Sequence, residues 1–175
     1  MPTSGILPLL TGGDRRSIGQ SPVAVKRVLR NPRLLPALLK CLASPDPLVR
    51  MRAADALEKL DRRRPGILTP YRAGLLRVAR ASDQTEVQWH MAQLLPRLDL
   101  TPRQLVEARR LLRRYQASPS AIVQTMALEA LVQLARATPP GRGEALRLLT
   151  VAATSGLPAV RARARRLRRG LLSSS

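Results

Sequence analysis

Residues 38–57 read LLKCLASPDPLVRMRAADAL and contain the pattern that decides the fold. The leucines continue an amphipathic run from Leu34, whose apolar residues lie three and four positions apart, as in a helix. The Ser/Pro/Asp stretch at 44–47 separates this helix from the next, because serine and aspartate cap helices and proline is tolerated in a first turn. A second helix with an alanine-rich face then begins near Val49. The stretch predicts two helices joined by a short turn.

The same pattern recurs four times along the chain, with a spacing of 36 to 38 residues. Each unit carries a Leu, a Ser six residues later, a Val five residues after the Ser, and a Leu eleven residues after the Val. The four columns are Leu38, Leu76, Leu112 and Leu149; Ser44, Ser82, Ser118 and Ser155; Val49, Val87, Val123 and Val160; and Leu60, Leu98, Leu134 and Leu171. Four columns in four copies establish an internal repeat.

Stop signals between the units set the expected boundaries. Proline and glycine follow arginines at 62–66, and Thr-Pro pairs open the later units at 101–102 and 138–139. We expect a capping helix at 21–31 and repeats at 32–63, 65–99, 101–137 and 139–172. Residues 1–20 lack a periodic face and are expected to be mobile, and the tail at 173–175 is expected to fray.

The composition supports an all-α fold in a single compact domain or short array. The 175 residues are rich in Leu, Ala and Arg, which are strong helix formers, while Phe is absent and aromatic residues make up 2%. The net charge is +20, from 31 Lys and Arg against 11 Asp and Glu, which favours acidic partners. The excess of Arg over Lys has two explanations, phosphate recognition or a GC-rich genome, and composition does not choose between them.

The sequence predicts a cytoplasmic protein. Its single cysteine, Cys41, cannot form an internal disulfide and falls in an apolar helical run. The early apolar stretch at 6–10 is too short for a signal-peptide core or a membrane span. We therefore expect neither export nor membrane anchoring.

Residues 38–57 resemble the HEAT repeat, whose signature has an Asp in the turn, a Val-Arg or Val-Lys pair opening the second helix, and an alanine-rich face. Here these are Asp46, Val49 and Arg50. The resemblance implies an all-α, right-handed α-solenoid of about four helix pairs, with second helices lining the concave side. In the family the Asp and Arg form a ladder between units. Substitutions at Gln88, Gln124 and Ser120 interrupt the expected ladder but leave the packing positions intact, and Arg161 restores the base in the fourth unit.

The resemblance also implies a binding function. HEAT-like proteins are mainly protein or peptide scaffolds; minority branches bind nucleic acid or act as enzymes, such as bacterial alkylpurine DNA glycosylases and phycobilin lyases. The sequence matches no catalytic set from those branches. We therefore expect a small bacterial adaptor, not an enzyme, that binds a protein or peptide partner along its concave face, with nucleic-acid binding as the alternative. No cofactor and no small-molecule substrate are expected.

Helical geometry predicts which side chains face the concave side. With each repeat Val set at zero and 100° added per residue, a column of positions points away from the packed face. The predicted concave residues are Met51, Asp55, Arg62, Trp89, Gln93, Arg97, Leu100, Thr125, Glu129, Arg136, Ala162 and Arg166. Trp89 is the strongest candidate, because an exposed Trp anchors a partner side chain or stacks on a base. The alternative is that Trp89 packs between neighbouring second helices.

Other chemistry is expected to be absent. His90 is the only histidine, and no recognisable ligand spacing surrounds it, so no metal site is predicted. Ser82 and Asp83 lie at a helix start, where capping explains them better than a catalytic relay does.

Two arginine sets are candidate anion or nucleic-acid sites. The first is Arg109, Arg110, Arg113 and Arg114, and the second is Arg161, Arg163, Arg165, Arg166, Arg168 and Arg169. Like charges four residues apart on one helix mildly lower helix stability, which suggests that these arginines have another role. A dense group of arginines is suited to binding phosphate or an acidic partner. A solvated terminal cap explains the second set equally well, because the end of a solenoid must stay polar. Aromatic interleaving and a glycine-rich phosphate loop, which would support nucleic-acid binding, are missing.

Overall fold

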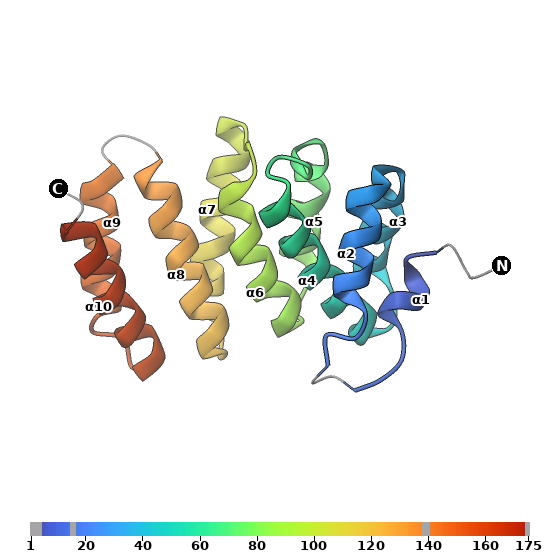
Figure 1. Cartoon of the computed structure of the whole chain (residues 1–175). Coiled ribbons are helices and arrows are strands. Elements are labelled where there is room, and N and C mark those ends of the chain that lie inside the picture. The colour runs from blue at the N-terminus through green and yellow to red at the C-terminus, as the bar shows by residue number, and fades with distance from the viewer. Residues whose placement is uncertain (1–4, 15–16, 138–140, 174–175) are drawn as a thin grey trace. The chain divides into compact units, whose positions relative to one another are not determined.

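A computed structural model of the chain describes residues 5–14, 17–137 and 141–173, and these residues form helices joined by turns, without a strand. The chain divides into two compact units, Met1–Asp99 (unit 1) and Leu100–Ser175 (unit 2), whose helices are labelled in Figure 1. The fold class is an α-solenoid built of helix pairs, as predicted. No helix among the described residues has the length and apolar character needed to cross a membrane.

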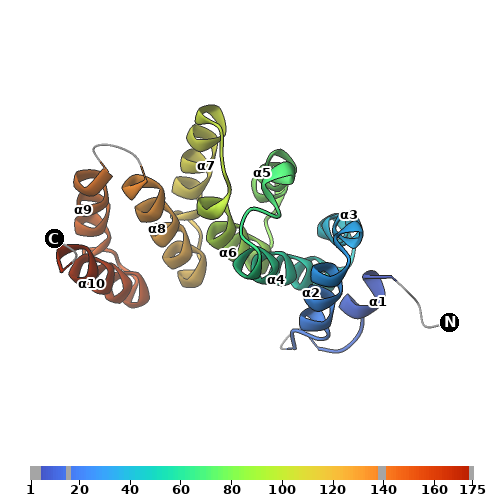
Figure 2. The same ribbon diagram turned by 45° about the horizontal axis from the view of Figure 1, so that its top comes forward.

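Unit 1 contains a capping region and two helix pairs. Its α-helices are α1 (Leu7–Leu10), α2 (Ser21–Arg30), α3 (Leu35–Lys40), α4 (Pro47–Arg63), α5 (Arg72–Ala81) and α6 (Thr85–Leu94). Short 3-10 turns lie at Pro32–Leu34, Cys41–Ala43, Thr69–Tyr71 and Leu95–Arg97. Helix α4 packs against both α2 and α6, so it lies between other helices on two sides (Figure 2).

Unit 2 contains two longer helix pairs, which are α7 (Pro102–Tyr115) with α8 (Ala121–Arg136) and α9 (Gly141–Ala152) with α10 (Pro158–Leu172). Helix α8 packs against α7, α9 and α10. Helix α7 starts with a capping box: Thr101 Oγ1 accepts from the Gln104 amide, and the Gln104 side chain accepts from the Thr101 amide.

The apolar columns found in the sequence form the interior of both units. All eight column leucines and all four column valines are buried, with exposed fractions between 0% and 6%. The period therefore marks the residues that pack each helix pair, as predicted.

The serine column has a structural role that repeats at every turn. The Oγ of Ser44, Ser82, Ser118 and Ser155 accepts a hydrogen bond from the backbone amide two residues later, at 3.2–3.3 Å. The carbonyl of the same serine accepts from the side chain six residues later, which is Arg50, Gln88, Gln124 or Arg161, at 2.7–3.0 Å. Gln and Arg thus make the same contact, and the substitutions at residues 88 and 124 preserve the turn.

A link between repeats exists in unit 1, although it does not use the turn aspartate of the second repeat. Arg50 Nε donates to Gln84 Oε1 at 2.9 Å, and Gln84 Nε2 donates to the Pro47 carbonyl at 2.9 Å. Asp46 instead caps α4, since its Oδ1 accepts from the Leu48 amide at 2.8 Å. The expected ladder therefore passes through Gln84.

The described part of residues 1–20 packs against unit 1. Ile6, Leu9 and Leu10 are buried, and Arg52 of α4 holds the following loop from inside. Its guanidinium, 1% exposed with the rest of the side chain, donates to the backbone carbonyls of Leu10, Thr11, Gly12, Asp14 and Ser17. The sequence did not predict these contacts, and the mobility expected for residues 1–20 stays a prediction. Residues 1–4, 15–16, 138–140 and 174–175 lie outside the described residues.

Candidate functional site

The predicted concave residues have three different environments. The structure buries Met51, Asp55 and Thr125; it leaves Trp89, Gln93, Arg97, Leu100 and Glu129 half-buried; and it exposes Arg62, Arg136, Ala162 and Arg166. Helical geometry alone predicted exposure for all of them. Met51 and Asp55 are buried because the neighbouring helices α2 and α6 cover that side of α4.

Buried carboxylates on α4 form an ion-pair network inside unit 1. Asp55 Oδ2 accepts from the Ser21 hydroxyl at 2.6 Å and from Lys59 at 2.7 Å. Glu58 Oε1 accepts from Arg62 at 2.6 Å and from Arg97 at 2.9 Å.

Arg97 extends this network to Asp61, because Arg97 Nε donates to Asp61 Oδ2 at 3.2 Å. Burial raises the pKa of Asp61, and the adjacent Arg97 guanidinium opposes that rise. Two of the predicted partner-binding residues, Arg62 and Arg97, thus have internal roles.

Trp89 lies at a pocket of about 350 Å³ in unit 1. The lining comprises Ser17, Ile18, Met51, Arg52, Asp55, Glu86, Trp89 and His90. Ser17 and Ile18 belong to the loop that Arg52 holds, so this N-terminal segment forms one wall of the pocket. Sequence reasoning missed that wall; the glycines at 12, 13 and 19, which adopt positive φ, were the available signal for a structured loop.

His90 follows Trp89 on α6 and lines the same pocket. The two rings make an edge-to-face contact with centroids 5.4 Å apart. Burial lowers the pKa of His90, and the carboxylates of Asp55, Glu58 and Glu86 partly offset this, while Lys59 adds to it. Its buried Nδ1 has no hydrogen-bond partner among the described residues. Within that same part of the chain, no group of three or more His, Cys, Asp and Glu could hold a metal ion.

The first arginine set, on α7, is partly engaged by Glu144 of α9. Arg109 donates to Glu144 at 3.1 Å and to the Leu134 carbonyl at 3.2 Å, and Arg113 lies 3.8 Å from Glu144. Arg110 and Arg114 are exposed. In this set, Arg109 and Arg113 thus contact Glu144, whereas Arg110 and Arg114 lie at the surface.

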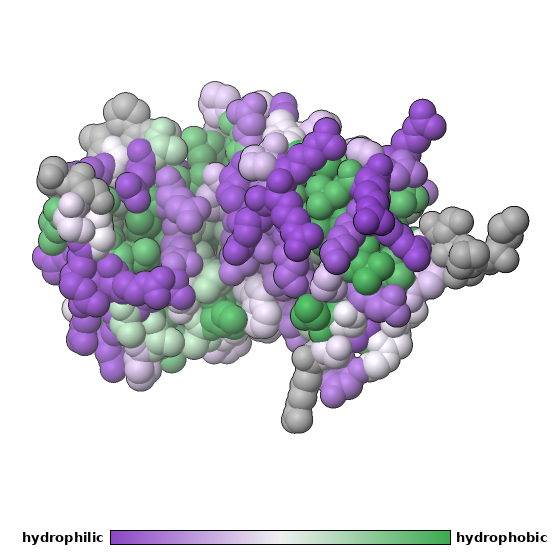
Figure 3. Space-filling model, viewed as in Figure 1, coloured by the Kyte–Doolittle hydropathy of each residue, from purple (hydrophilic) through white to green (hydrophobic). Residues whose placement is uncertain are grey.

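The second set, on α10, is also split. Arg161 donates to the carbonyls of Ser155 and Gly156, and Arg163 forms an ion pair with Glu129 of α8. The remaining four are exposed and form no ion pair with the described residues: Arg165, Arg166, Arg168 and Arg169. Hydrophilic side chains gather over α10 in the space-filling view (Figure 3).

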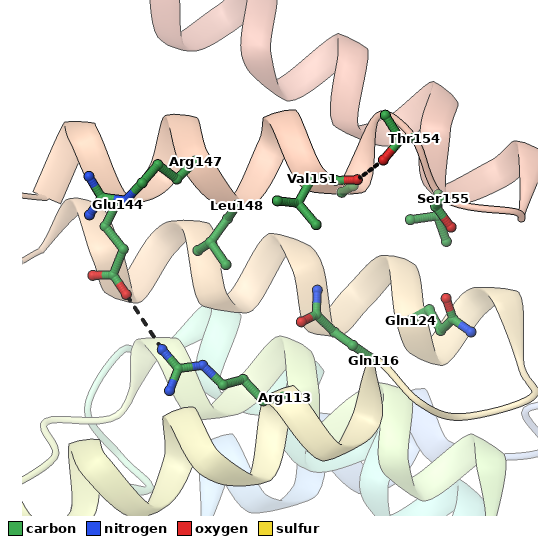
Figure 4. A pocket seen from close by; sticks show the side chains of 11 residues that line it. Arg113, Gln116, Gln124, Glu144, Arg147, Leu148, Val151, Thr154 and Ser155 are labelled. Atoms are coloured by element: carbon green, nitrogen blue, oxygen red, sulfur yellow. Dashed lines mark hydrogen bonds and ion pairs between the residues drawn. The ribbon is translucent and has the colours of Figure 1, made fainter.

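A groove that the sequence did not predict lies in unit 2 and has a volume of about 680 Å³. Its lining is shared by α7, α8, α9 and the start of α10 (Figure 4). Leu148 and Val151 of α9 supply apolar surface, and Arg113 and Arg147 lie at one end. No single stretch of sequence contains this arrangement, because the residues come from four elements.

Comparisons with known proteins agree with this architecture. The HEAT repeat family model matches residues 34–62, which are α3, α4 and their turn. A crystal structure of an engineered protein, a target of the Northeast Structural Genomics Consortium, is similar with a TM-score of 0.59 and 20% sequence identity, over 96% of this chain and 78% of the engineered one. No curated protein sequence matches the chain.

Proposed function

Because the chain carries a HEAT repeat within an α-solenoid fold, we propose that it is a non-enzymatic scaffold that binds a protein or peptide partner through the Trp89 pocket of unit 1. HEAT repeats generally mediate protein interactions. The observation that carries the proposal is the half-buried Trp89 at a pocket of about 350 Å³. Buried aromatic anchors in such pockets dominate the energetics of protein interfaces.

The pocket suits one inserted side chain from the partner. Trp89, Met51 and Ile18 offer apolar surface, while Asp55, Glu86 and Arg52 make part of its wall polar. A partner side chain with an apolar stem and a polar end would satisfy both parts. A cytoplasmic setting belongs to the same proposal, and its support is the single cysteine, Cys41, which is buried and unpaired. A bacterial origin is part of the proposal only through the resemblance to small HEAT-repeat proteins of that type.

The test compares Trp89→Ala with a matched change elsewhere. Ile122 is also a large apolar residue on a second helix and is 40% exposed, so Ile122→Ala is the control. Proteins recovered with each variant from lysate are quantified by mass spectrometry. We expect Trp89→Ala to lose its specific partners at least about tenfold and Ile122→Ala to keep them. The same partner set with both variants would contradict the proposal.

A second candidate function is nucleic-acid binding through α10, favoured by the four exposed arginines that form no ion pair with the described residues. Binding through about four phosphate contacts predicts a log-log salt slope of roughly −4 on duplex DNA. The variant carrying Gln at Arg165, Arg166, Arg168 and Arg169 spares Arg161 and Arg163, whose contacts are internal. We expect it to abolish most of the slope. Absence of wild-type binding at low salt, or an unchanged slope in the variant, would exclude this function.

A further inference from the structure

The groove of unit 2 combines an exposed apolar strip with an end whose net charge is positive. Val151 of α9 is 74% exposed, the highest value among the exposed large hydrophobic residues of the described chain. Leu148 lies one helical turn earlier on the same side, and both side chains point toward α8 and α7 (Figure 4). Exposed apolar surface beside a concavity is typical of a binding groove.

Charge at the groove indicates what could occupy it. Arg113 is 60% exposed and Arg147 is exposed, and both line the groove. Among the described residues, Glu144 is the only carboxylate that lines the groove, and it is shared by Arg109 at 3.1 Å and Arg113 at 3.8 Å, which leaves the Arg147 charge in excess. Over residues 100–175 there are 14 Arg and 3 Glu. The groove therefore attracts negative charge and has little of its own.

From this combination we propose that the groove between α7 and α9 binds an acidic peptide segment of a partner protein, with an apolar side chain of that segment on Leu148 and Val151 and its carboxylates at Arg113 and Arg147. The groove volume of about 680 Å³ is within the range of small-ligand and peptide pockets. This site is separate from the Trp89 pocket and does not depend on it.

The lining favours a peptide over a nucleic acid. None of the described residues that line it has an aromatic side chain on which a base could stack. Its apolar strip, formed by Leu148, Val151 and Ala152, offers nothing to a sugar-phosphate backbone but matches an aliphatic side chain. Phosphate contacts are better served by the exposed arginines of α10, which lie outside the lining.

The experiment uses the full chain and two fluorescein-labelled peptides, both Glu-rich and identical except for one central residue, Leu or Ala. Affinities are measured by fluorescence anisotropy at low salt. We expect the Leu peptide to bind about fivefold to tenfold more tightly than the Ala peptide, which is the difference for burying the larger side chain. Val151→Ser should abolish this preference. Val106→Ser is the matched control, because Val106 is 58% exposed in unit 2 but does not line the groove.

The electrostatic part is tested with a charge-matched pair of double variants. Arg113→Gln with Arg147→Gln should weaken both peptides at least about fivefold, whereas Arg165→Gln with Arg166→Gln should weaken them less than about twofold. Circular dichroism confirms that each variant is folded, and all these positions are exposed.

Several results would overturn the proposal. Equal affinities for the Leu and Ala peptides, no binding of either peptide, or a Leu preference that survives Val151→Ser would each do so. Equal weakening by the two double variants would show attraction to net charge alone. A labelled duplex that loses affinity with Val151→Ser as the Leu peptide does would make the groove a nucleic-acid site instead.

Discussion

Units 1 and 2 are both strongly basic, but they place their carboxylates differently. Residues 1–99 contain 17 Lys and Arg against 8 Asp and Glu, and residues 100–175 contain 14 against 3. In unit 1 the acids Asp55, Glu58 and Asp61 are buried on α4 and bind cations there. In unit 2 the half-buried Glu129 and Glu144 engage only part of the arginines.

This difference separates two kinds of surface. Spacings of three residues put the α4 acids on one side of a helix, where they tie neighbouring helices together through Arg97 and Ser21. Unit 1 is therefore stabilised by internal polar contacts and presents a pocket. Unit 2 has too few acids for such a network, so its surplus cations stay at the surface, where they are available to acidic partners.

Arg52→Ala should have the largest effect, and it acts on unit 1 alone. The change leaves five backbone carbonyls without their donor and opens a cavity in a buried site, so we expect a loss of about 3–5 kcal/mol in the free energy of unfolding. Urea unfolding followed by the fluorescence of Trp89, the single Trp of the chain, reports on unit 1. Arg165→Ala, an exposed site in unit 2, should change it by under about 0.5 kcal/mol. A loss below about 1 kcal/mol for Arg52→Ala would show that the buried guanidinium is not essential.

Gly141→Ala is the corresponding test of unit 2. An added Cβ would lie 2.2 Å from the Ala135 carbonyl oxygen and 3.1 Å from Arg136 Cα, and these backbone atoms cannot move aside as a flexible side chain could. We expect a destabilisation of about 1–3 kcal/mol. Hydrogen exchange with mass spectrometry should show faster exchange in α8 and α9 and unchanged protection in unit 1. Faster exchange in both units would mean that they unfold together.

The pH dependence should distinguish the units next, because His90 is in unit 1 and unit 2 has no histidine. Burial lowers the pKa of His90 in the folded state, so the unfolded chain binds a proton at higher pH than the folded chain does. The stability that the neutral His90 contributes to the folded state is fully present above a pH of about 6.5, the pKa of an unfolded histidine. The free energy of unfolding then decreases by up to about 1.4 kcal/mol per pH unit as the pH falls from there to the lowered pKa of the folded state. Trp89-monitored unfolding between neutral and mildly acidic pH measures this slope. His90→Gln should flatten it, and an equal slope in the variant would assign it to other groups.

Gly170→Ala should have the smallest effect and the opposite sign. Gly170 is inside α10, and nothing lies within 4 Å of the position its Cβ would occupy. Alanine in a helix is favoured over glycine, so we expect unit 2 to gain about 0.5 kcal/mol. The comparison with Gly141→Ala, measured by the same hydrogen-exchange experiment, separates backbone entropy from steric contact within one unit. Faster hydrogen exchange in α10 of the Gly170→Ala variant would contradict the predicted stabilisation.

The repeat could be predicted because packing follows sequence period: the column residues such as Val49 and Leu60 are buried wherever they recur. The exposure of residues on the opposite, predicted concave side of the second helices could not be predicted, because it depends on which helices lie next to them. Met51 and Asp55 are covered by α2 and α6, a fact of tertiary packing that a helical projection does not contain. The loop held by Arg52 was missed for a related reason: its carbonyls are bonded by a residue about 40 positions away.

The four turns share a consequence for the charge of the protein. At each turn a side-chain N–H reaches the serine carbonyl six residues back, supplied by arginine at residues 50 and 161 and by glutamine at residues 88 and 124. Both side chains present a terminal donor at similar reach, although only one is charged. Each turn thus requires a long side chain with a terminal N–H, and that side chain can be charged or neutral. Basicity in this chain can therefore be raised or lowered at the turns while the bond to the serine carbonyl is kept, although arginine adds a second bond to the carbonyl of residue 45 or 156.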